Sequence, residues 1–288
     1  MVENRLYLGT ANLGMLYGIA NSKPVSKEEA LRVLTWSKEK IDFIDYAPDY
    51  LNSDELLRQF SNSFSVTTKV NFDALQTGQA LHEHLSYQLQ TLGIARFHHI
   101  LVRYPTKSKG NFSELWKTLE ELRDAGICSK IGFSVYNPND VLEVIDIYEG
   151  VQVFQVPENL LDRRFSKFMH AYSSSLQHIE FVVRSIFLQG LLLMPEAEIP
   201  SHLVSITPYL RRVRQEAIKQ DCSMVQLATS YVKQLHWSSG TIVGANSLQQ
   251  LIEIHGAFHE NSNTSFDFLS RIESASIQIV DPRLWKKA

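Results

Sequence analysis

Three residues whose side chains can take part in proton transfer lie at or after short apolar runs early in the chain. Asp45 closes the run DFID, Tyr50 comes five residues later, and Lys69 stands at the end of FSVTTKV. An ammonium paired with an aspartate keeps its charge, and it lowers the pKa of a nearby tyrosine from its usual value of about 10. Such a tyrosine can protonate a carbonyl oxygen as hydride reaches the carbonyl carbon.

Each of these residues also has a purely structural explanation. A lysine at a strand end is more often solvated, Asp45 could cap a turn, and Tyr50 could be an aromatic residue on the rim of a pocket. Their convergence on neighbouring strand ends favours the catalytic interpretation, because chemistry in a parallel barrel lies where strands end and loops begin.

Arg103 follows the apolar residues 100–102. A guanidinium at the end of a buried strand is costly to desolvate unless an anion meets it. Asp45 is the nearest carboxylate by strand order, but Lys69 should already engage it. We therefore expect Arg103 to bind an anionic or highly polar substrate.

Short β-rich runs alternate with amphipathic segments along the whole chain. In segment 26–39, Ser26 and Glu29 have capping-box spacing, and segment 113–126 ends at a glycine. Helical patterns also cover 137–150, and both 207–220 and 223–236 follow the seventh strand. The predicted strands are residues 5–10, 42–45, 64–70, 97–102, 129–135, 151–156, 180–186 and 240–245.

Eight such units predict an α/β fold, a (β/α)8 barrel, formed by one domain over residues 1–288. A doubly wound sheet would want G-x-G-x-x-G after an early strand, and the sequence GTANLGMLYG lacks that spacing.

Composition excludes several classes of protein. The 288 residues are 44% hydrophobic and carry a net charge of -3, without a basic stripe, so we expect no nucleic-acid partner. No apolar run reaches the roughly 18 residues that cross a bilayer. Cys128 and Cys222 lack CxxC spacing, which favours a reduced cytoplasmic compartment.

No metal site is expected from the histidine pattern. His82 and His84 point to different faces of a helix. His255 and His259 have i, i+4 spacing but no third ligand near them in the sequence, so a solvated helix face is the simpler explanation.

Seven segments, in order, resemble those of the aldo-keto reductase superfamily over nearly the whole chain. The first resembles the opening of a bacterial branch. The segments are LGTANLGMLYGIAN (8–21), FIDYAPDYLNSDELL (43–57), TTKV (67–70), KIGFSVYNPNDV (130–141), FQVPENLLDRR (154–164), VRSIFLQGLL (183–192) and IVGANSLQQL (242–251).

The resemblance makes Asp45, Tyr50 and Lys69 three members of a catalytic tetrad. Arg103 stands at the fourth position, where relatives usually have a histidine that orients and polarises the substrate carbonyl. Arginine can donate a hydrogen bond there but cannot accept a proton. His98 and His99 lie deeper in a strand that should end by Pro105, so neither replaces that histidine.

The resemblance also implies a nicotinamide dinucleotide extended across the barrel mouth, NADPH with NADH as the alternative. Ser134 and Gln155 match positions that hold the nicotinamide carboxamide. Arg184 stands where many relatives stack an aromatic ring on the nicotinamide, and a guanidinium can stack too. The other matched cofactor positions are Thr10, Ser185, Phe187, Leu188, Gly190, Gly244, Ala245, Asn246, Ser247 and Gln250.

The last of these loops should hold the adenine ribose and any 2′-phosphate, because helix N-terminal amides bind anions. Asn246 stands where some relatives have an arginine for that phosphate, so we expect only a weak preference for NADPH.

The sequence thus predicts a reductase of an aldehyde or ketone, sugar-derived or anionic, that acts as a monomer or weak oligomer. The alternative is a cofactor-binding regulator or scaffold with little turnover. The retained Asp45, Tyr50 and Lys69 favour the enzyme, and Arg103 is the main feature against it. In this family the C-terminal tail can close over the substrate, which makes Trp285 a residue of interest.

Overall fold

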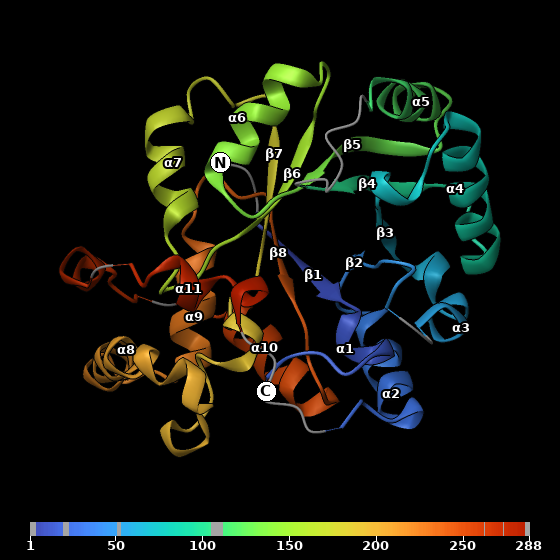
Figure 1. Cartoon of the computed structure of the whole chain (residues 1–288). Coiled ribbons are helices and arrows are strands. Elements are labelled where there is room, and N and C mark those ends of the chain that lie inside the picture. Colours follow the sequence, from blue (N-terminus) through green and yellow to red (C-terminus); the bar gives the residue numbers. More distant parts are fainter. Residues whose placement is uncertain are drawn as a thin grey trace.

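The computed structural model describes residues 4–19, 23–50, 53–104, 112–261, 263–272 and 274–285. Eight parallel strands form a closed barrel, in which β8 pairs with β1, and this confirms the predicted (β/α)8 fold (Figure 1). The strands are β1 (Arg5–Gly9), β2 (Phe43–Asp45), β3 (Ser65–Val70), β4 (Phe97–Arg103), β5 (Cys128–Ser134), β6 (Val153–Pro157), β7 (Glu180–Arg184) and β8 (Gly240–Val243).

Helices surround the barrel, and the colours of Figure 1 follow the chain around that ring. Two helices separate β7 from β8, as predicted. The helices are α1 (Ala11–Gly14), α2 (Lys27–Ser37), α3 (Ser53–Arg58), α4 (Gly78–Leu92), α5 (Ser113–Asp124), α6 (Pro138–Ile147), α7 (Arg164–Tyr172), α8 (Thr207–Lys219), α9 (Met224–Lys233), α10 (Leu248–His259) and α11 (Ile277–Val280).

The barrel strands carry apolar side chains on both faces, because one face meets the helices and the other fills the barrel. In β4, Ile100 and Val102 belong to the large cluster that includes the helix faces, whereas Leu101 belongs to a separate small cluster. Six strands each contribute one residue to this second cluster, which fills the interior: Tyr7, Phe43, Leu101, Val153, Val182 and Ile242.

The helix-capping prediction is half right. Ser26 accepts a hydrogen bond from the Glu29 backbone amide, as a capping box requires. The Glu29 carboxylate does not return to Ser26, because it accepts from the Leu248 amide at the start of α10, 2.7 Å away. A complete capping box forms instead at α6, between Asn137 and Asp140.

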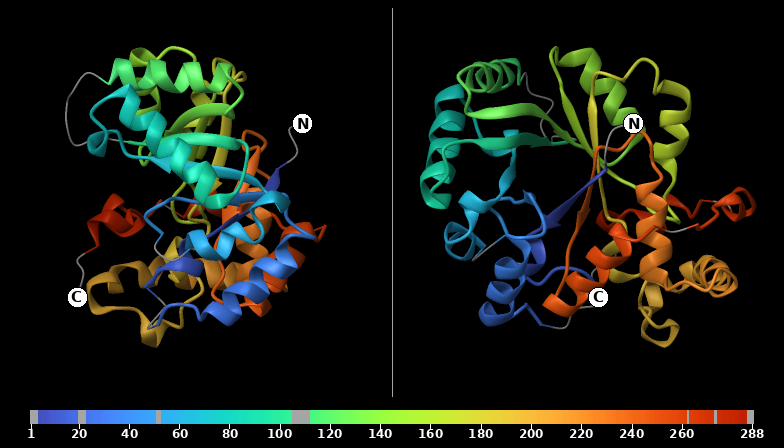
Figure 2. Two further views of the ribbon diagram at one scale, coloured as in Figure 1. Left: turned by 90° about the vertical axis from the view of Figure 1, so that its right-hand side faces the viewer. Right: turned by 180° about the vertical axis from the view of Figure 1, so that it is seen from behind.

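The two ends of the barrel differ in what covers them. In the left view of Figure 2, the N and C labels lie on opposite sides of the molecule. The loops that follow the strands lie at the C-terminal end of the barrel, where the predicted site residues are. Pro105, predicted to end the fourth strand, lies outside the described residues. Of the helices described, none is long and apolar enough to span a membrane.

Candidate active site

A cavity of about 810 Å³ lies over the C-terminal ends of the strands. Its walls come from strand tips and from the loops that follow β1, β7 and β8. Most of the predicted residues line it, namely Asp45, Tyr50, Lys69, Arg103, Ser134, Gln155, Arg184, Ser185, Phe187, Gly190, Gly244, Asn246 and Gln250.

The predicted trio meets at the floor of this cavity. The Lys69 ammonium donates to both carboxylate oxygens of Asp45, at 2.7 and 2.5 Å, and both side chains are buried. It also donates to the Tyr50 hydroxyl at 3.4 Å. Parallel register brings them together, since β2 pairs with β3 and Asp45 lies beside Thr67. The structure therefore assembles a buried ion pair that touches a phenol.

The electrostatics of Tyr50 differ from the sequence-based expectation. Burial, reinforced by the Asp45 charge, raises the pKa of Tyr50, and the Arg103 guanidinium opposes that rise. Burial also lowers the pKa of Lys69, against the pull of Asp45. The pKa of Tyr50 is therefore raised, not lowered as predicted, because burial of the phenol and the Asp45 charge outweigh the nearby cations. Tyr50 is consequently a protonated phenol at neutral pH.

Arg103 meets a carboxylate that the sequence reasoning overlooked. Its guanidinium donates to Asp49 Oδ1 at 2.5 Å, and the side chain is 39% exposed. The tip of β4 is thus wetter than predicted, and the desolvation cost is correspondingly smaller. Arg103 still lines the cavity beside Tyr50, so it remains within the candidate site.

Arg184 stacks on a ring of the protein itself. Its guanidinium carbon lies 4.2 Å from the centre of the Tyr136 ring, and it donates to the Val135 carbonyl at 3.0 Å. The guanidinium of Arg283, from the C-terminal segment, lies 3.5 Å from the same ring. The tail therefore reaches the cavity wall through Arg283, whereas the Trp285 indole donates to the Ile279 carbonyl.

Ser134 and Gln155 form a polar pair at the tips of adjacent strands. The Ser134 hydroxyl donates to the Gln155 carbonyl oxygen at 3.3 Å, and the Gln155 amide nitrogen donates to Asp45 at 2.7 Å. Gln155 keeps one N–H donor and one oxygen lone pair free of these two bonds, and the Ser134 hydroxyl keeps its lone pairs. The pair can therefore form hydrogen bonds with a carboxamide group of a ligand.

Unusual backbone geometry marks the loop after β7. Ser185, Leu188 and Gln189 have φ angles of 64°, 48° and 56°, in the left-handed region that non-glycine residues rarely adopt. The Gln189 carbonyl accepts from the Ile19 amide at 3.2 Å, which ties this loop to the one after β1. Strained backbone of this kind often marks ligand-binding loops.

Polar groups of the loop after β8 already form hydrogen bonds with side chains of the same chain. Asn246 accepts from the Asn12 amide at 2.6 Å, and its backbone amide donates to Gln250. At the start of α10, Glu29 occupies the Leu248 amide. The expected anion site at this helix N-terminus is therefore occupied in part by a carboxylate, which disfavours a phosphate there.

Four predicted residues do not line the cavity. Thr10 is buried and donates to the Asp45 carbonyl, which fastens β1 to β2. Leu188 and Ala245 are buried in the core. Ser247 caps α10 by accepting from the Gln250 amide. These positions support the loops that form the walls.

Several lining residues were missed by the sequence reasoning. Asn12 lies within the opening segment whose resemblance was noted, and Asp49 directly precedes Tyr50, so both could have been suspected. Tyr136 also lies within a segment whose resemblance was noted, whereas Glu253 gave no local signal, because only the fold brings α10 to the cavity.

Fold and site together define a (β/α)8 barrel with a buried Asp-Lys-Tyr cluster beneath a large cavity. The sequence model of the Aldo/keto reductase family matches residues 5–277, and the chain belongs to this family of oxidoreductases.

Solved structures are similar over most of their length. An aldo-keto reductase from Bacillus halodurans, in its holo form, has 17% identity and a TM-score of 0.75, covering 98% of this chain and 95% of that chain. A glycerol dehydrogenase from Gluconobacter oxydans has 18% identity and a TM-score of 0.71, covering 93% and 89%. At these identities the likeness shows the fold alone. A search of curated protein sequences found no match.

Proposed function

We propose that this chain is an NAD(P)H-dependent reductase of a small aldehyde or ketone, with Tyr50 as the general acid. The observation that carries the proposal is the contact between the Tyr50 hydroxyl and the buried Lys69–Asp45 pair at the floor of the cavity. Family membership supports an oxidoreductase, and the cluster supplies the proton that carbonyl reduction consumes.

The volume of the cavity, about 810 Å³, is within the usual range of ligand pockets, and the polar groups on its walls support the proposal of a dinucleotide. The Ser134–Gln155 pair would hold a carboxamide near Tyr50. A Cβ at Gly244 would lie 2.3 Å from the Asn12 side-chain oxygen, so a larger residue there would displace Asn12 from the cavity wall. When bound, a reduced nicotinamide supplies the hydride.

Three residues then share the work of proton transfer. Asp45 fixes the Lys69 ammonium, and Lys69 in turn holds the Tyr50 oxygen in place. The raised pKa of Tyr50 keeps the proton on its hydroxyl until a carbonyl oxygen accepts it. Lys69 stabilises the phenolate that remains, because an adjacent cation favours the charged form.

Arg103 takes the role of orienting the substrate. Its guanidinium lies at the cavity wall and can donate to the carbonyl oxygen or to an acidic group on the substrate. Since Asp49 already binds this guanidinium, an anionic substrate has to compete with Asp49. We therefore propose a preference for polar or acidic carbonyl compounds, including sugar-derived ones.

NADPH remains the proposed cofactor, with little discrimination against NADH. At the α10 end of the cavity the described lining contains Glu253, and Glu29 holds a helix amide next to it. The negative charge of these carboxylates reduces the attraction of the helix N-terminus for a 2′-phosphate.

Two measurements on the full-length chain test the proposal. The first titrates NADPH and NADH by quenching of tryptophan fluorescence. The second follows oxidation of each reduced nucleotide during incubation with neutral and carboxylated carbonyl compounds. We expect both nucleotides to bind and turnover to depend on the carbonyl compound. Binding without turnover over a broad panel would favour the regulator or scaffold instead, and absence of binding would overturn the proposal.

A further inference from the structure

We propose that His98, His99 and Glu180 form a binding site for a divalent transition-metal ion, with Zn²⁺ as the representative ion. The three lie at the N-terminal end of the barrel, opposite the active-site cavity. His98 and His99 are the second and third residues of β4, and Glu180 begins β7. The sequence predicted no metal site because these two segments are far apart in the chain.

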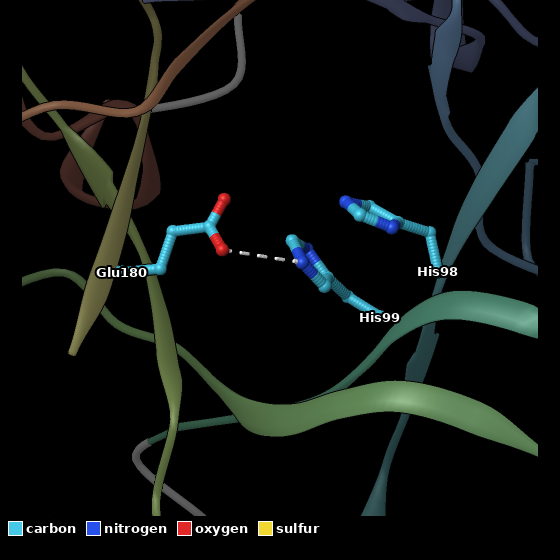
Figure 3. A group of neighbouring side chains, drawn as sticks. All are labelled: His98, His99 and Glu180. Atoms are coloured by element: carbon cyan, nitrogen blue, oxygen red, sulfur yellow. Dashed lines mark ion pairs between the residues drawn. The ribbon is translucent and has the colours of Figure 1, made fainter. Parts of the chain in front are cut away.

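The three side chains gather potential ligand atoms in one place. One ligand atom from each residue lies within 4.8 Å of the other two. Figure 3 shows the Glu180 carboxylate pointing at the His99 ring, with His98 stacked on His99. The His99 Nε2 atom lies 3.7 Å from a Glu180 oxygen. Zinc binds nitrogen and oxygen at about 2.0–2.2 Å, so binding requires the stacked imidazoles to rotate until one nitrogen of each points at the same ion.

An unsatisfied ring nitrogen points into this cluster. His99 is 1% exposed, and its Nε2 atom has no hydrogen-bond partner among the described residues. A buried polar atom without a partner is rare and costly. The His98 Nε2 atom lies 3.4 Å from the Tyr7 hydroxyl, and each imidazole has two ring nitrogens, one of which can serve as the metal ligand.

One protein cation competes for this site. The Lys130 ammonium donates to the Glu180 Oε2 atom at 2.5 Å, and the lysine side chain is 40% exposed, so it can swing into solvent. The other Glu180 oxygen accepts from Ser239. Arg5 and Arg96 add positive potential around His98. A metal ion must therefore displace Lys130, and removal of that charge should tighten binding.

Two imidazoles and one carboxylate favour a borderline ion such as Zn²⁺ over Mg²⁺ or Ca²⁺, which prefer oxygen ligands. Water would complete the coordination, since His98 is only partly buried. The ion would join β4 to β7, which are not adjacent in the barrel. His99 lies four residues before Arg103, about 13 Å along the strand, so the site should affect stability more than turnover.

Calorimetric titration of untagged, chelator-treated protein with ZnCl₂ tests the proposal. We expect one ion per chain and a melting temperature raised by about 4 °C when zinc is at 100 times its Kd. Cobalt should give the intense visible absorption of four-coordinate Co²⁺. H99Q should weaken zinc binding ~100-fold. K130M should strengthen it about tenfold, a gain that misfolding cannot produce.

H255Q is the matched control, because it breaks the His255–His259 pair on α10, away from the proposed site, and should leave binding unchanged. Circular dichroism confirms that H99Q is folded. Equal zinc affinity in wild type and H99Q, loss of binding in H255Q, or absence of binding in both wild type and K130M would each overturn the site.

Discussion

At the scale of single residues, the Arg103–Asp49 pair is the feature that distinguishes this site. The guanidinium is held by a carboxylate next to Tyr50 in the sequence, and both side chains are partly exposed. Such a pair is weak in water, so a substrate anion can exchange with Asp49 at small cost. On the proposed function, Arg103 would thereby select substrates.

Substitutions of Asp49 and of Arg103 should have opposite effects on the affinity for a carboxylated substrate. D49N frees the guanidinium and should lower KM for a carboxylated carbonyl compound several-fold. R103H should raise KM for that compound more than it lowers kcat, and should improve reduction of a matched neutral aldehyde.

Steady-state assays of this compound pair over increasing salt provide the check. The carboxylated compound alone should lose affinity with salt, because exposed charges are screened. If both substitutions affect both compounds equally, Arg103 has a structural role.

Between elements, a buried carboxyl joins β6 to two helices. Glu158, just after β6, accepts from the Ser166 hydroxyl on α7 at 2.6 Å and from the Tyr231 hydroxyl on α9 at 2.5 Å. Burial raises its pKa from 4.5 to about 8 despite these hydrogen bonds. The folded chain thus keeps Glu158 protonated where the unfolded chain does not.

This difference fixes the sign of a pH effect. Between about pH 4.5 and 8 the folded state binds the extra proton, so this contribution to stability is lost as pH rises through that window. E158Q removes the titrating group, and the fall in melting temperature from pH 5 to pH 8 should become shallower. Thermal unfolding followed by circular dichroism at each pH measures this dependence. If the melting temperature of E158Q falls with pH as steeply as that of the wild type, other groups cause the loss of stability.

Strand packing sets a second test at this scale. Gly132 on β5 has no room for a side chain, because a Cβ would lie 1.7 Å from the Val153 carbonyl oxygen on β6. G132A should destabilise the fold by about 3 kcal/mol. Gly256 on α10 has nothing within 4 Å of its Cβ position, so G256A should be neutral or stabilising by up to about 1 kcal/mol. Urea unfolding separates the two, and equal effects would contradict the packing argument.

Local sequence signals predicted the elements well but not the partners of side chains. The eight strands follow from β-rich runs, and the Ser26 cap follows from its spacing. The choice of Glu29 for the Leu248 amide depends on the meeting of α2 and α10, which no local pattern encodes. Asp49 was likewise missed as the partner of Arg103, because loop geometry decides that contact.

At the scale of the molecule, the two ends of the barrel have different tasks. The C-terminal end carries the cavity and the Asp45–Lys69–Tyr50 cluster. The N-terminal end is closed by rings that pack on one another, as Tyr7 and Phe43 do at 4.7 Å. The family resemblance predicted the site at the C-terminal end. The histidine cluster at the N-terminal end is apparent only in the three-dimensional structure.

The comparison of Y50F with Y46F tests the central claim most directly. Tyr46 is a buried neighbour in the same loop, its hydroxyl donates to Asp54 at 2.7 Å, and it does not line the cavity. Carbonyl-dependent oxidation of NADPH and NADPH affinity would be measured for both variants. We expect Y50F to lose ~10²–10⁴-fold in kcat with nearly unchanged affinity, and Y46F to retain turnover. Wild-type turnover in Y50F would contradict the role of Tyr50 as the proton donor.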